Sequence, residues 1–414
     1  MSDHRPNGAR SPGRPGRSGQ LTGVRVLDLS WHLAGPFCTL ILADLGADVI
    51  KVEKPGSHGG YDPAGFIRHR YKDQDAHYMA LNRNKRSITL DLKSAAGKAA
   101  FLRLVRRSDV VFNNFRPGVM DRLGLSADAL REANPRIISA ALSAFGSDGP
   151  YAERPGVDLV IQALSGGMSM TGERGAPPVR AGIPLADLAG GMWAAIGILA
   201  SLRARDQGLI EHDEIDVGLL DGQIAMIPYF SAYYFLDGFI PGPQGSGGHS
   251  PTYGAFECAD GRYVVIAVID QAPWHRLCGA LGLAELERDP RFATATLRTD
   301  NEAELQPIVA RRFGTQPSHV WEARLRAADV PYACVNRLDE ALADPQVRHR
   351  QMVVDIDHTL GDTLRFVGNP VKSAAFAPRY ASPPIIGEHT SEVLREAGLG
   401  ESAIDDLRAT GVIA

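Results

Sequence analysis

Short apolar stretches with different spacings succeed one another at the start of the chain. Positions 24–29 (Val-Arg-Val-Leu-Asp-Leu) and 48–53 (Asp-Val-Ile-Lys-Val-Glu) are typical of short strands, and the apolar positions of 37–45 between them predict a helix. Pro36 suits the first turn of that helix, and Gly46 ends it. A strand, a helix and a second strand in this order predict a parallel βαβ unit with a right-handed crossover.

The same alternation continues downstream. Helical spacing at 95–107 and 126–133 is interleaved with strand patterns at 109–115 and 137–145, and the longest helix candidate, 188–205, is apolar nearly all round. Alternating strands and helices predict an α/β sheet with helices on its faces. A helix that is apolar all round is expected to be buried.

The pattern changes after this helix. A further helix is expected at 219–236, followed by the Gly- and Pro-rich stretch 238–248. Strand patterns at 253–258 and 262–269 flank an Asp-Gly turn and predict a β-hairpin. Residues 273–350 are expected to be mainly helical, so we place a second, smaller α+β domain here.

The last seventy residues return to strand patterns, at 352–357 and 364–367, and to a terminal helix at 390–398. We therefore expect this segment to rejoin the first domain. The resulting division is a disordered tail at 1–20, the first part of a large domain at 21–218, a linker helix at 219–239, a small domain at 240–345 and a return to the large domain at 346–414.

Composition excludes several classes of protein. The chain has 414 residues with 44 basic and 48 acidic side chains, a net charge of −4, so nucleic acid is not the expected ligand. A mean hydropathy of −0.13 and the lack of a long apolar run argue against a membrane partner. Four cysteines rule out a disulfide scaffold, and residues 1–20 lack the apolar core of a secretory signal. We expect a cytoplasmic protein.

Common cofactor motifs are absent from the sequence. It contains no G-x-G-x-x-G after the first strand, no G-x-x-x-x-G-K-[ST], no C-x-x-C, no H-E-x-x-H and no G-x-S-x-G. No metal ligands are therefore predicted. The α/β sheet starts like a dinucleotide-binding fold but lacks its glycine motif, so another kind of ligand is expected.

Three stretches carry candidate chemistry. Residues 81–93 hold four cations and suggest either a solvated basic strand edge or a phosphate clamp. The stretch 113–118 follows a predicted strand, where ligands of open α/β sheets bind. There Phe115 would stack on a base and Arg116 or Arg122 would face phosphate, or the stretch is a strand-end turn with a buried Phe.

The third stretch, 182–192, contains Asp187 just before the long helix. An aspartate at this position is commonly an N-cap, which accepts hydrogen bonds from the first amides of a helix. It is alternatively a carboxylate held near an acyl group as a nucleophile or base. Position alone favours the cap.

These stretches belong to a longer series of matches in a fixed order. The matching positions are 21–28, 34–36, 45–56, 82–93, 114–118, 149–150, Asp158 with Gln162, 166–167, 171–172, 177–178, Asp187 and 387–390. Together they resemble the class III CoA-transferase family, also called the CaiB/BaiF family, which includes formyl-CoA:oxalate CoA-transferase and is related to α-methylacyl-CoA racemase.

The resemblance implies a Rossmann-like large domain built from both chain ends, a small domain, and a homodimer of two interlocked, ring-shaped chains. It implies that Asp187 is the nucleophile, that an acyl-CoA and a carboxylic acid are the substrates, and that no cofactor is permanently bound. The reaction is then an acyl-CoA:carboxylate CoA transfer through an aspartyl-CoA thioester, with a small mono- or dicarboxylic acid as the expected partner.

The resemblance also implies positions for the substrate contacts. Coenzyme A (CoA) would be bound by Leu33, Ala34, Lys54, Leu90, Asp91, Leu92, Lys93, Asn114, Phe115, Arg116, Arg122 and Asp158. A glycine-rich loop with Gly247 and Gly248 would stabilise oxyanions, or it is a flexible hinge.

Three departures from the family pattern narrow the function. Leu33 stands where formyl-transferase-like members have Gln, and Pro155 stands where they have Lys, so formyl and oxalate groups are not the expected substrates. Val157 stands where the racemase branch has the His of its two-base pair. We therefore expect a transferase. The alternatives are an acyl-CoA racemase or isomerase, an intramolecular CoA transfer between two carboxylates of one acid, and a non-catalytic CoA-binding subunit.

Overall fold

The computed structural model describes residues 19–57, 69–248 and 250–414. The tail expected at 1–20 lies almost wholly outside these ranges. The chain forms two compact units, one of Met1–Ser165, Gly182–Phe235 and His349–Ala414, and the other of Gly166–Ala181 and Leu236–Arg348. The second unit thus includes the segment Gly166–Ala181, which the sequence placed in the large domain.

A six-stranded parallel sheet forms the centre of the first unit. Its strands lie in the order β5-β2-β1-β6-β7-β8. Their bounds are Arg25–Asp28 (β1), Asp48–Glu53 (β2), Arg86–Thr89 (β5), Val110–Asn113 (β6), Ile138–Ser143 (β7) and Asp213–Gly218 (β8). From β1 the chain adds β2 and β5 on one side of the sheet, and it then returns to place β6, β7 and β8 on the other side of β1. The strand order therefore reverses between β1 and β6. In such sheets a crevice opens at the carboxyl ends of the strands beside this switch point.

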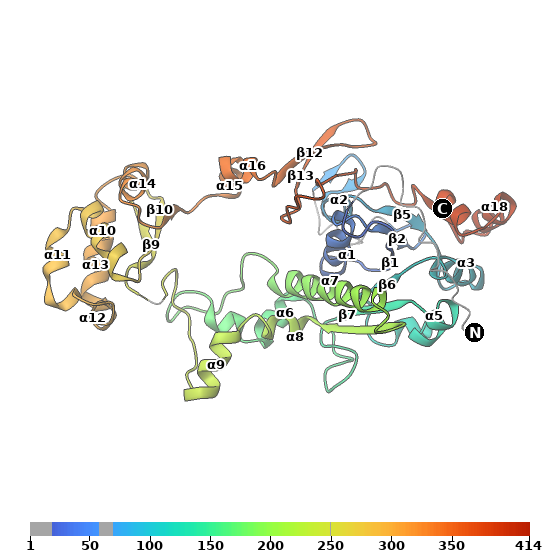
Figure 1. Cartoon of the computed structure of the whole chain (residues 1–414), viewed down its shortest axis with the longest axis horizontal. Coiled ribbons are helices and arrows are strands. Elements are labelled where there is room, and N and C mark those ends of the chain that lie inside the picture. Colours follow the sequence, from blue (N-terminus) through green and yellow to red (C-terminus); the bar gives the residue numbers. More distant parts are fainter. Residues whose placement is uncertain (1–18, 58–68, 249) are drawn as a thin grey trace. The chain divides into compact units, whose positions relative to one another are not determined.

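Helices cover both faces of the sheet because neighbouring strand residues point to opposite sides. Val26 packs with α1 (Ala34–Asp44) and α7 (Leu185–Asp206), whereas Leu27 packs with α3 (Ala95–Val105) and α5 (Ala127–Ala133). Figure 1 shows α1 and α7 together on one side of the strands and α3 and α5 on the other. The βαβ unit, the alternation and the parallel sheet predicted from the sequence are confirmed.

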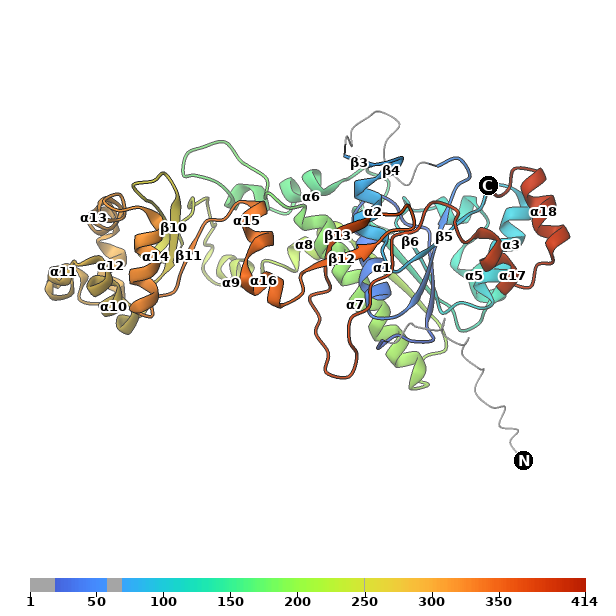
Figure 2. The same cartoon turned by 90° about the horizontal axis from the view of Figure 1, so that it is seen from above.

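The C-terminal helices complete the second of these faces. Val393 and Leu394 of α17 (Thr390–Glu396) and Ile404 of α18 (Glu401–Ala409) share one core with Leu27. The backbone amide of Thr89 donates to Thr390 Oγ1 at 3.0 Å, which joins α17 to β5. Figure 2 shows α17 and α18 beside α3 and α5, with the C-terminus close by.

The second unit contains an antiparallel sheet of β9 (Tyr253–Glu257), β10 (Tyr263–Ala267) and β11 (Tyr332–Cys334). The β9–β10 pair confirms the predicted hairpin. Trp274 and Trp321 are fully buried in its core. Its helices are α10 (Gln271–Leu281), α11 (Ala284–Arg288), α12 (Ala295–Asp300), α13 (Glu302–Phe313), α14 (Ser318–Ala327), α15 (Leu338–Ala343) and α16 (Pro345–His349).

The remaining elements connect or extend these cores. They are β3 (Arg70–Tyr71), β4 (Gln74–Asp75), α2 (Ala76–Asn82), α4 (Val119–Arg122), α6 (Asp158–Leu164), α8 (Leu219–Ile224), α9 (Pro228–Asp237), β12 (Val353–Asp357) and β13 (Thr363–Val367), with short 3₁₀ turns at Gly167–Met170 and Pro290–Phe292. The single helix expected at 219–236 is wrong: Pro228 begins a new helix, since proline lacks the amide that would continue α8.

The helix α7 begins earlier than expected, at Leu185. By length and hydropathy it is the one helix among the described residues that reaches the span of a bilayer, and half of its most apolar stretch is buried inside the chain. Core helices of globular proteins have the same properties.

Candidate functional site

A cavity of about 740 Å³ lies at the carboxyl ends of β1, β2, β5 and β6, within the first unit. Each of these strands is followed by residues of the cavity wall, which are 29–32 after β1, 54 and 57 after β2, 90–93 after β5 and 114–116 after β6. The topology therefore places the cavity at the switch point of the sheet, where α/β proteins bind ligands.

Most of the residues expected to contact the ligand line this cavity. They are Lys54, Leu90, Asp91, Leu92, Lys93, Asn114, Phe115 and Arg116. Leu33, Ala34, Arg122, Asp158 and Asp187 are not part of its wall, although Gly156 and Val157, directly before Asp158, are. Gly247 and Gly248 belong to the second unit.

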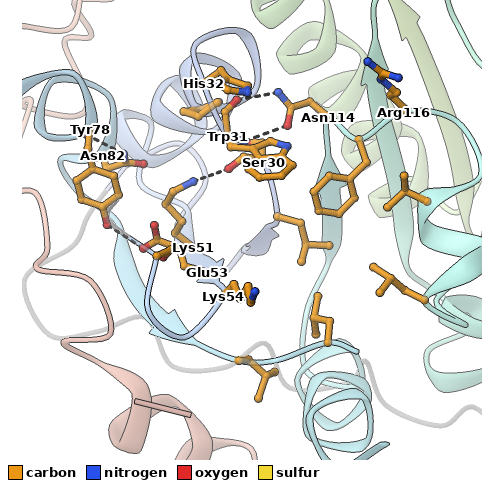
Figure 3. Close-up of a pocket in the computed structure, with 18 of the residues that line it drawn as sticks. Ser30, Trp31, His32, Lys51, Glu53, Lys54, Tyr78, Asn82, Asn114 and Arg116 are labelled. Carbon is orange, nitrogen blue, oxygen red and sulfur yellow. Dashed lines mark hydrogen bonds between the residues drawn. The ribbon is translucent and has the colours of Figure 1, made fainter. Parts of the chain in front are cut away.

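Three of the lining cations remain available for an anion. No ion pair within the described ranges engages Lys54, Lys93 or Arg116. Their positive charges follow three different strands at one edge of the sheet, as Figure 3 shows for Lys54 and Arg116. Such an arrangement suits a ligand with several phosphates.

The other three cations of the basic stretch 81–93 are absent from the cavity wall, so both expectations are corrected for these three cations, whereas Lys93 lines the cavity. Arg83 pairs with Asp44, Lys85 with Asp28, and Arg86 with Asp48 and Glu396, and all three cations are buried. A buried charge requires a partner of opposite sign. These residues therefore stabilise the fold, and they are neither a solvated strand edge nor a phosphate clamp.

Asp28 and Lys85 form a fully buried ion pair beneath the first loop. Burial opposes ionisation of Asp28, yet Lys51, Lys85 and hydrogen bonds from Ser30 and Thr39 lower its pKa to about 2. Burial lowers the pKa of Lys85 to about 8 despite the charge of Asp28. Both groups are therefore charged at neutral pH.

Asn114 contacts the protein backbone with both ends of its amide. Its Oδ1 accepts from Trp31 N at 3.0 Å, and its Nδ2 donates to Trp31 O at 2.8 Å. Trp31 is half exposed and meets the ring of Phe115 edge-on, with centroids 5.8 Å apart. The aromatic side chain of Trp31 thus forms part of the cavity wall (Figure 3).

Sequence reasoning missed several residues of the wall. Ser57, His77, Tyr78 and Asn82 line the cavity, as do Trp31 and His32. Trp31 and His32 follow the first strand, a position that could have singled them out. His77 and Tyr78 lie on α2, for which the sequence had predicted no element, so no signal pointed to them, whereas Asn82, the last residue of α2, belongs to the stretch 81–93 but was not singled out.

Asp187 lies in the first turn of α7 and is not its N-cap, which is Pro184. The amides of Ala186 and Asp187 instead donate to Asp158 Oδ1, at 2.9 and 3.3 Å. Gln162 Nε2 donates to the other carboxylate oxygen of Asp158 at 2.7 Å. Asp158 therefore performs the capping role that the sequence had favoured for Asp187.

The surroundings of Asp187 make its carboxyl group unusually basic. Burial raises the pKa of Asp187, the negative charge of Asp158 raises it further, and together they move it from 3.8 to about 7. Desolvation and a like charge both disfavour the ionised form. A carboxylate with this pKa is a better nucleophile and base than an exposed aspartate, so the arrangement suits covalent catalysis or proton transfer.

The start of α7 lies against the start of α1. A side chain at Gly191 would bring its Cβ to 2.6 Å from Ala34 O, so only glycine permits this approach of the two helices. Gly191 follows Asp187 by four residues and therefore lies on the same helix face. Asp187 is thus about one turn along α7 from the residue that packs against the start of α1.

Metal ligands do not gather at this site. Among the residues that the structure describes, no group of three or more His, Cys, Asp and Glu side chains is arranged to hold a metal ion.

Comparison with known proteins assigns the family. The profile of CoA-transferase family III matches residues 21–390. An acyl-CoA transferase of Fusarium pseudograminearum is 37% identical over 95% of this chain and 88% of its own length. A succinate–glutarate CoA-transferase of Agrobacterium fabrum is 36% identical, with 92% and 96% covered. The human succinyl-CoA:glutarate CoA-transferase is 33% identical, with 95% and 90% covered.

A solved structure shows the same fold. A CaiB/BaiF family protein from Brucella suis superposes with a TM-score of 0.81 at 32% identity, over 92% of this chain and 99% of that chain. The matches in sequence and in structure extend over nearly the whole chain, so this protein belongs to CoA-transferase family III and is a CoA-transferase.

Proposed function

We propose that the protein transfers CoA from an acyl-CoA to a small carboxylic acid through a thioester on Asp187. The observation that carries this proposal is the carboxyl group of Asp187, whose pKa is raised to about 7 in the first turn of α7. Asp187 also lies one turn along α7 from Gly191, which packs against the start of α1, and α1 follows the wall of a cavity with three available cations.

The reaction proceeds by exchange between acyl groups. A carboxylate oxygen of Asp187 attacks the thioester carbonyl, CoA leaves as a thiolate, and a mixed anhydride forms. The thiolate attacks the aspartyl carbonyl, releases the donor acid and leaves an aspartyl-CoA thioester. The acceptor carboxylate attacks that thioester and displaces the thiolate, which then takes the acceptor acyl group from the new anhydride and restores Asp187. Covalent catalysis divides one difficult transfer into steps of similar energy.

The cavity supplies the CoA site in this proposal. Lys54, Lys93 and Arg116 would face the phosphates, and Leu90 and Leu92 would form apolar walls. Asp91, Phe115, Leu33, Ala34 and Arg122 remain proposed contacts near the same strand ends. Asp158 would hold the start of α7 through its two hydrogen bonds. The chain needs no permanently bound cofactor for this chemistry.

The site must exclude water, because water would hydrolyse the anhydride and the thioester. The oxyanions that develop during each transfer also need hydrogen-bond donors. We propose that Gly247 and Gly248 supply these donors. These residues lie in the second unit, in a segment where Gly245 N donates to Gly172 O at 2.7 Å.

The names of similar proteins favour a dicarboxylic acid. Relatives at 33–36% identity are CoA-transferases of succinate and glutarate, and one at 35% identity acts on mesaconate. We propose a small dicarboxylate as the acceptor. Transfer between two carboxylates of one acid would use the same residues.

We further propose a cytoplasmic homodimer of interlocked chains. The helix α9 supports an association, because Tyr233, Tyr234 and Phe235 are all more than 40% exposed. Exposed apolar patches of this kind mark protein interfaces. Light scattering during size-exclusion chromatography tests this, and a mass of 44.5 kDa would contradict it.

Trapping tests the covalent mechanism. The enzyme is incubated with succinyl-CoA alone, treated with hydroxylamine and digested. We expect a hydroxamate on the peptide with Asp187, and none in the Asp187→Asn variant. Asp158→Asn is the matched control, because it removes the neighbouring carboxylate and retains the nucleophile. An adduct on another residue, or an active Asp187→Ala enzyme, would contradict the proposal.

Proton transfer is the second candidate, since a carboxylate with a pKa near 7 also acts as a base. Val157, the N-cap of α6, has no ionisable group to serve as a second base. Exchange of the α-hydrogen of an acyl-CoA in D₂O without an acceptor acid would favour this candidate, and its absence would support transfer.

A further inference from the structure

A strained backbone position lies in the wall of the cavity. His32 has a φ of 63°, in the left-handed region that side chains other than glycine rarely adopt. The other such residues in the described ranges are Lys72, Asn84, Asp329 and Gln351, and none of them lines the cavity. Strained positions persist only where the surrounding structure holds them, and they gather at functional sites.

Side chains from three different elements hold the loop around His32. The carbonyls of Ser30, Trp31 and His32 each accept one hydrogen bond. The donors are, in the same order, Lys51 Nζ of β2 at 2.5 Å, Asn114 Nδ2 after β6 at 2.8 Å and His77 Nε2 of α2 at 3.2 Å. Side chains outside the loop 30–33 therefore fix the orientation of its three peptide planes.

His77 is the donor whose contact falls on the strained residue. A carbonyl oxygen only accepts, so Nε2 of His77 carries the proton in this contact. The backbone of His77 is held in turn, because its amide donates to Oδ1 of Asp75, the N-cap of α2, at 2.7 Å. Figure 3 shows His32 beside Trp31 above the cavity.

The loop connects the cavity with the nucleophile. Ala34 follows the loop directly, and its carbonyl lies against Gly191, on the helix face that also carries Asp187. A displacement of the loop would therefore shift both the cavity wall and the start of α1, against which α7 packs at Gly191, one turn after Asp187.

We propose that His77 is a positioning residue, whose hydrogen bond to His32 O keeps the loop 30–33 in the strained conformation that sets an acyl-CoA thioester against Asp187. The inference rests on the proposed function, because it takes the cavity as the acyl-CoA site. His77 acts on the loop and forms no bond with the reacting atoms.

The first test replaces the donor. In His77→Phe the ring remains and the hydrogen bond is lost, whereas Gln in His77→Gln still presents an N–H. We expect His77→Phe to form the Asp187 thioester about tenfold more slowly in single-turnover measurements with succinyl-CoA, the effect of about one hydrogen bond. His77→Gln should react within about twofold of the wild type, because it can restore the contact.

The second test relieves the backbone strain at His32. If His77 only stabilised the fold, relief of this strain would not change the reaction rate. Glycine adopts a positive φ without steric cost. In the double variant His32→Gly/His77→Phe we expect the rate to recover at least threefold over His77→Phe, by the same reasoning. His32→Ala/His77→Phe is the matched control, since it also lacks the side chain of His32 but keeps the strain, and it should show no recovery.

The outcomes separate this inference from the function on which it rests. If the wild type forms no thioester on Asp187, the proposed function fails. If the wild type reacts and His77→Phe reacts equally fast, or if glycine and alanine at position 32 have equal effects, the positioning role of His77 is refuted and the proposed function stands. Thermal unfolding of each variant identifies any that fails to fold, and if His77→Phe does not fold, His77→Leu, which also lacks the donor, takes its place in the comparison with His77→Gln.

Discussion

Replacing Asp187 by asparagine should make the protein more stable and inactive. Burial and the charge of Asp158 raise the pKa of Asp187 from 3.8 to about 7 in the folded chain. The unfolded chain has neither effect, so its aspartate ionises near pH 3.8. Since the folded-state pKa is the higher one, the stability contributed by the protonated group is fully present below about pH 4 and is lost as the pH rises through about 7.

The magnitude follows from the difference between the two pKa values. About three pKa units at about 1.4 kcal/mol each give a penalty of up to about 4 kcal/mol above pH 7. At pH 5 the folded group is still protonated and the penalty is about 1.7 kcal/mol, so it grows by about 2–3 kcal/mol between pH 5 and pH 8. Asparagine has a similar shape, does not ionise and is free of this penalty.

Urea titrations of the wild type and Asp187→Asn at pH 5 and pH 8 measure the effect. We expect the variant to gain about 2–3 kcal/mol more over the wild type at pH 8 than at pH 5. Other titrating groups are common to both proteins and cancel in this difference. Asp148→Asn, at an exposed carboxylate of the same unit, is the matched control for the loss of one acidic side chain. An equal difference in unfolding free energy at both pH values would refute the reasoning.

Three further substitutions test the site and the fold. Asp158→Asn removes the like charge beside Asp187, so the pKa of Asp187 should fall and the acidic limb of the kcat/KM profile should move to lower pH; an unchanged limb would contradict the coupling. Lys85→Met leaves Asp28 buried without its closest cation and should cost about 3–5 kcal/mol in urea titrations. Lys93→Met should leave the unfolding free energy within about 0.5 kcal/mol of the wild type and raise the Kd for CoA about tenfold in calorimetry; equal affinity would remove Lys93 from the CoA site.

The strands of the α/β sheet were largely predictable because their residues repeat with a simple period. The patterns at 24–29 and 48–53 became β1 and β2, and the hairpin at 253–269 formed as expected. The strand β8 was not predicted. Its sequence, Asp-Glu-Ile-Asp-Val-Gly, carries three acidic residues, and at the edge of the sheet two of them, Glu214 and Asp216, are exposed.

The basic stretch shows where a linear reading fails. Arg83, Lys85 and Arg86 lie close to Lys93 in the sequence and carry the same charge, yet only Lys93 lines the cavity. The difference depends on Asp44, Asp28 and Asp48, which lie roughly forty or more residues away in the sequence and meet these cations only in the folded chain. No local pattern distinguishes a cation that pairs with such an acid from one that remains available for a ligand.

The sequence by itself determined the α/β class, the N-terminal βαβ unit and the hairpin of the second unit, and it identified Asp187 as a candidate nucleophile. The hydrophobic period, the turn residues and the order of the motifs can all be recognised along the chain without knowledge of its fold. The tertiary structure decided which charges face a ligand, that Asp158 caps α7 and raises the pKa of Asp187, and that His77 contacts the strained His32. These features depend on side chains that are distant in sequence and on burial, which alters the free energy of a charge or of a strained backbone only after the chain has folded.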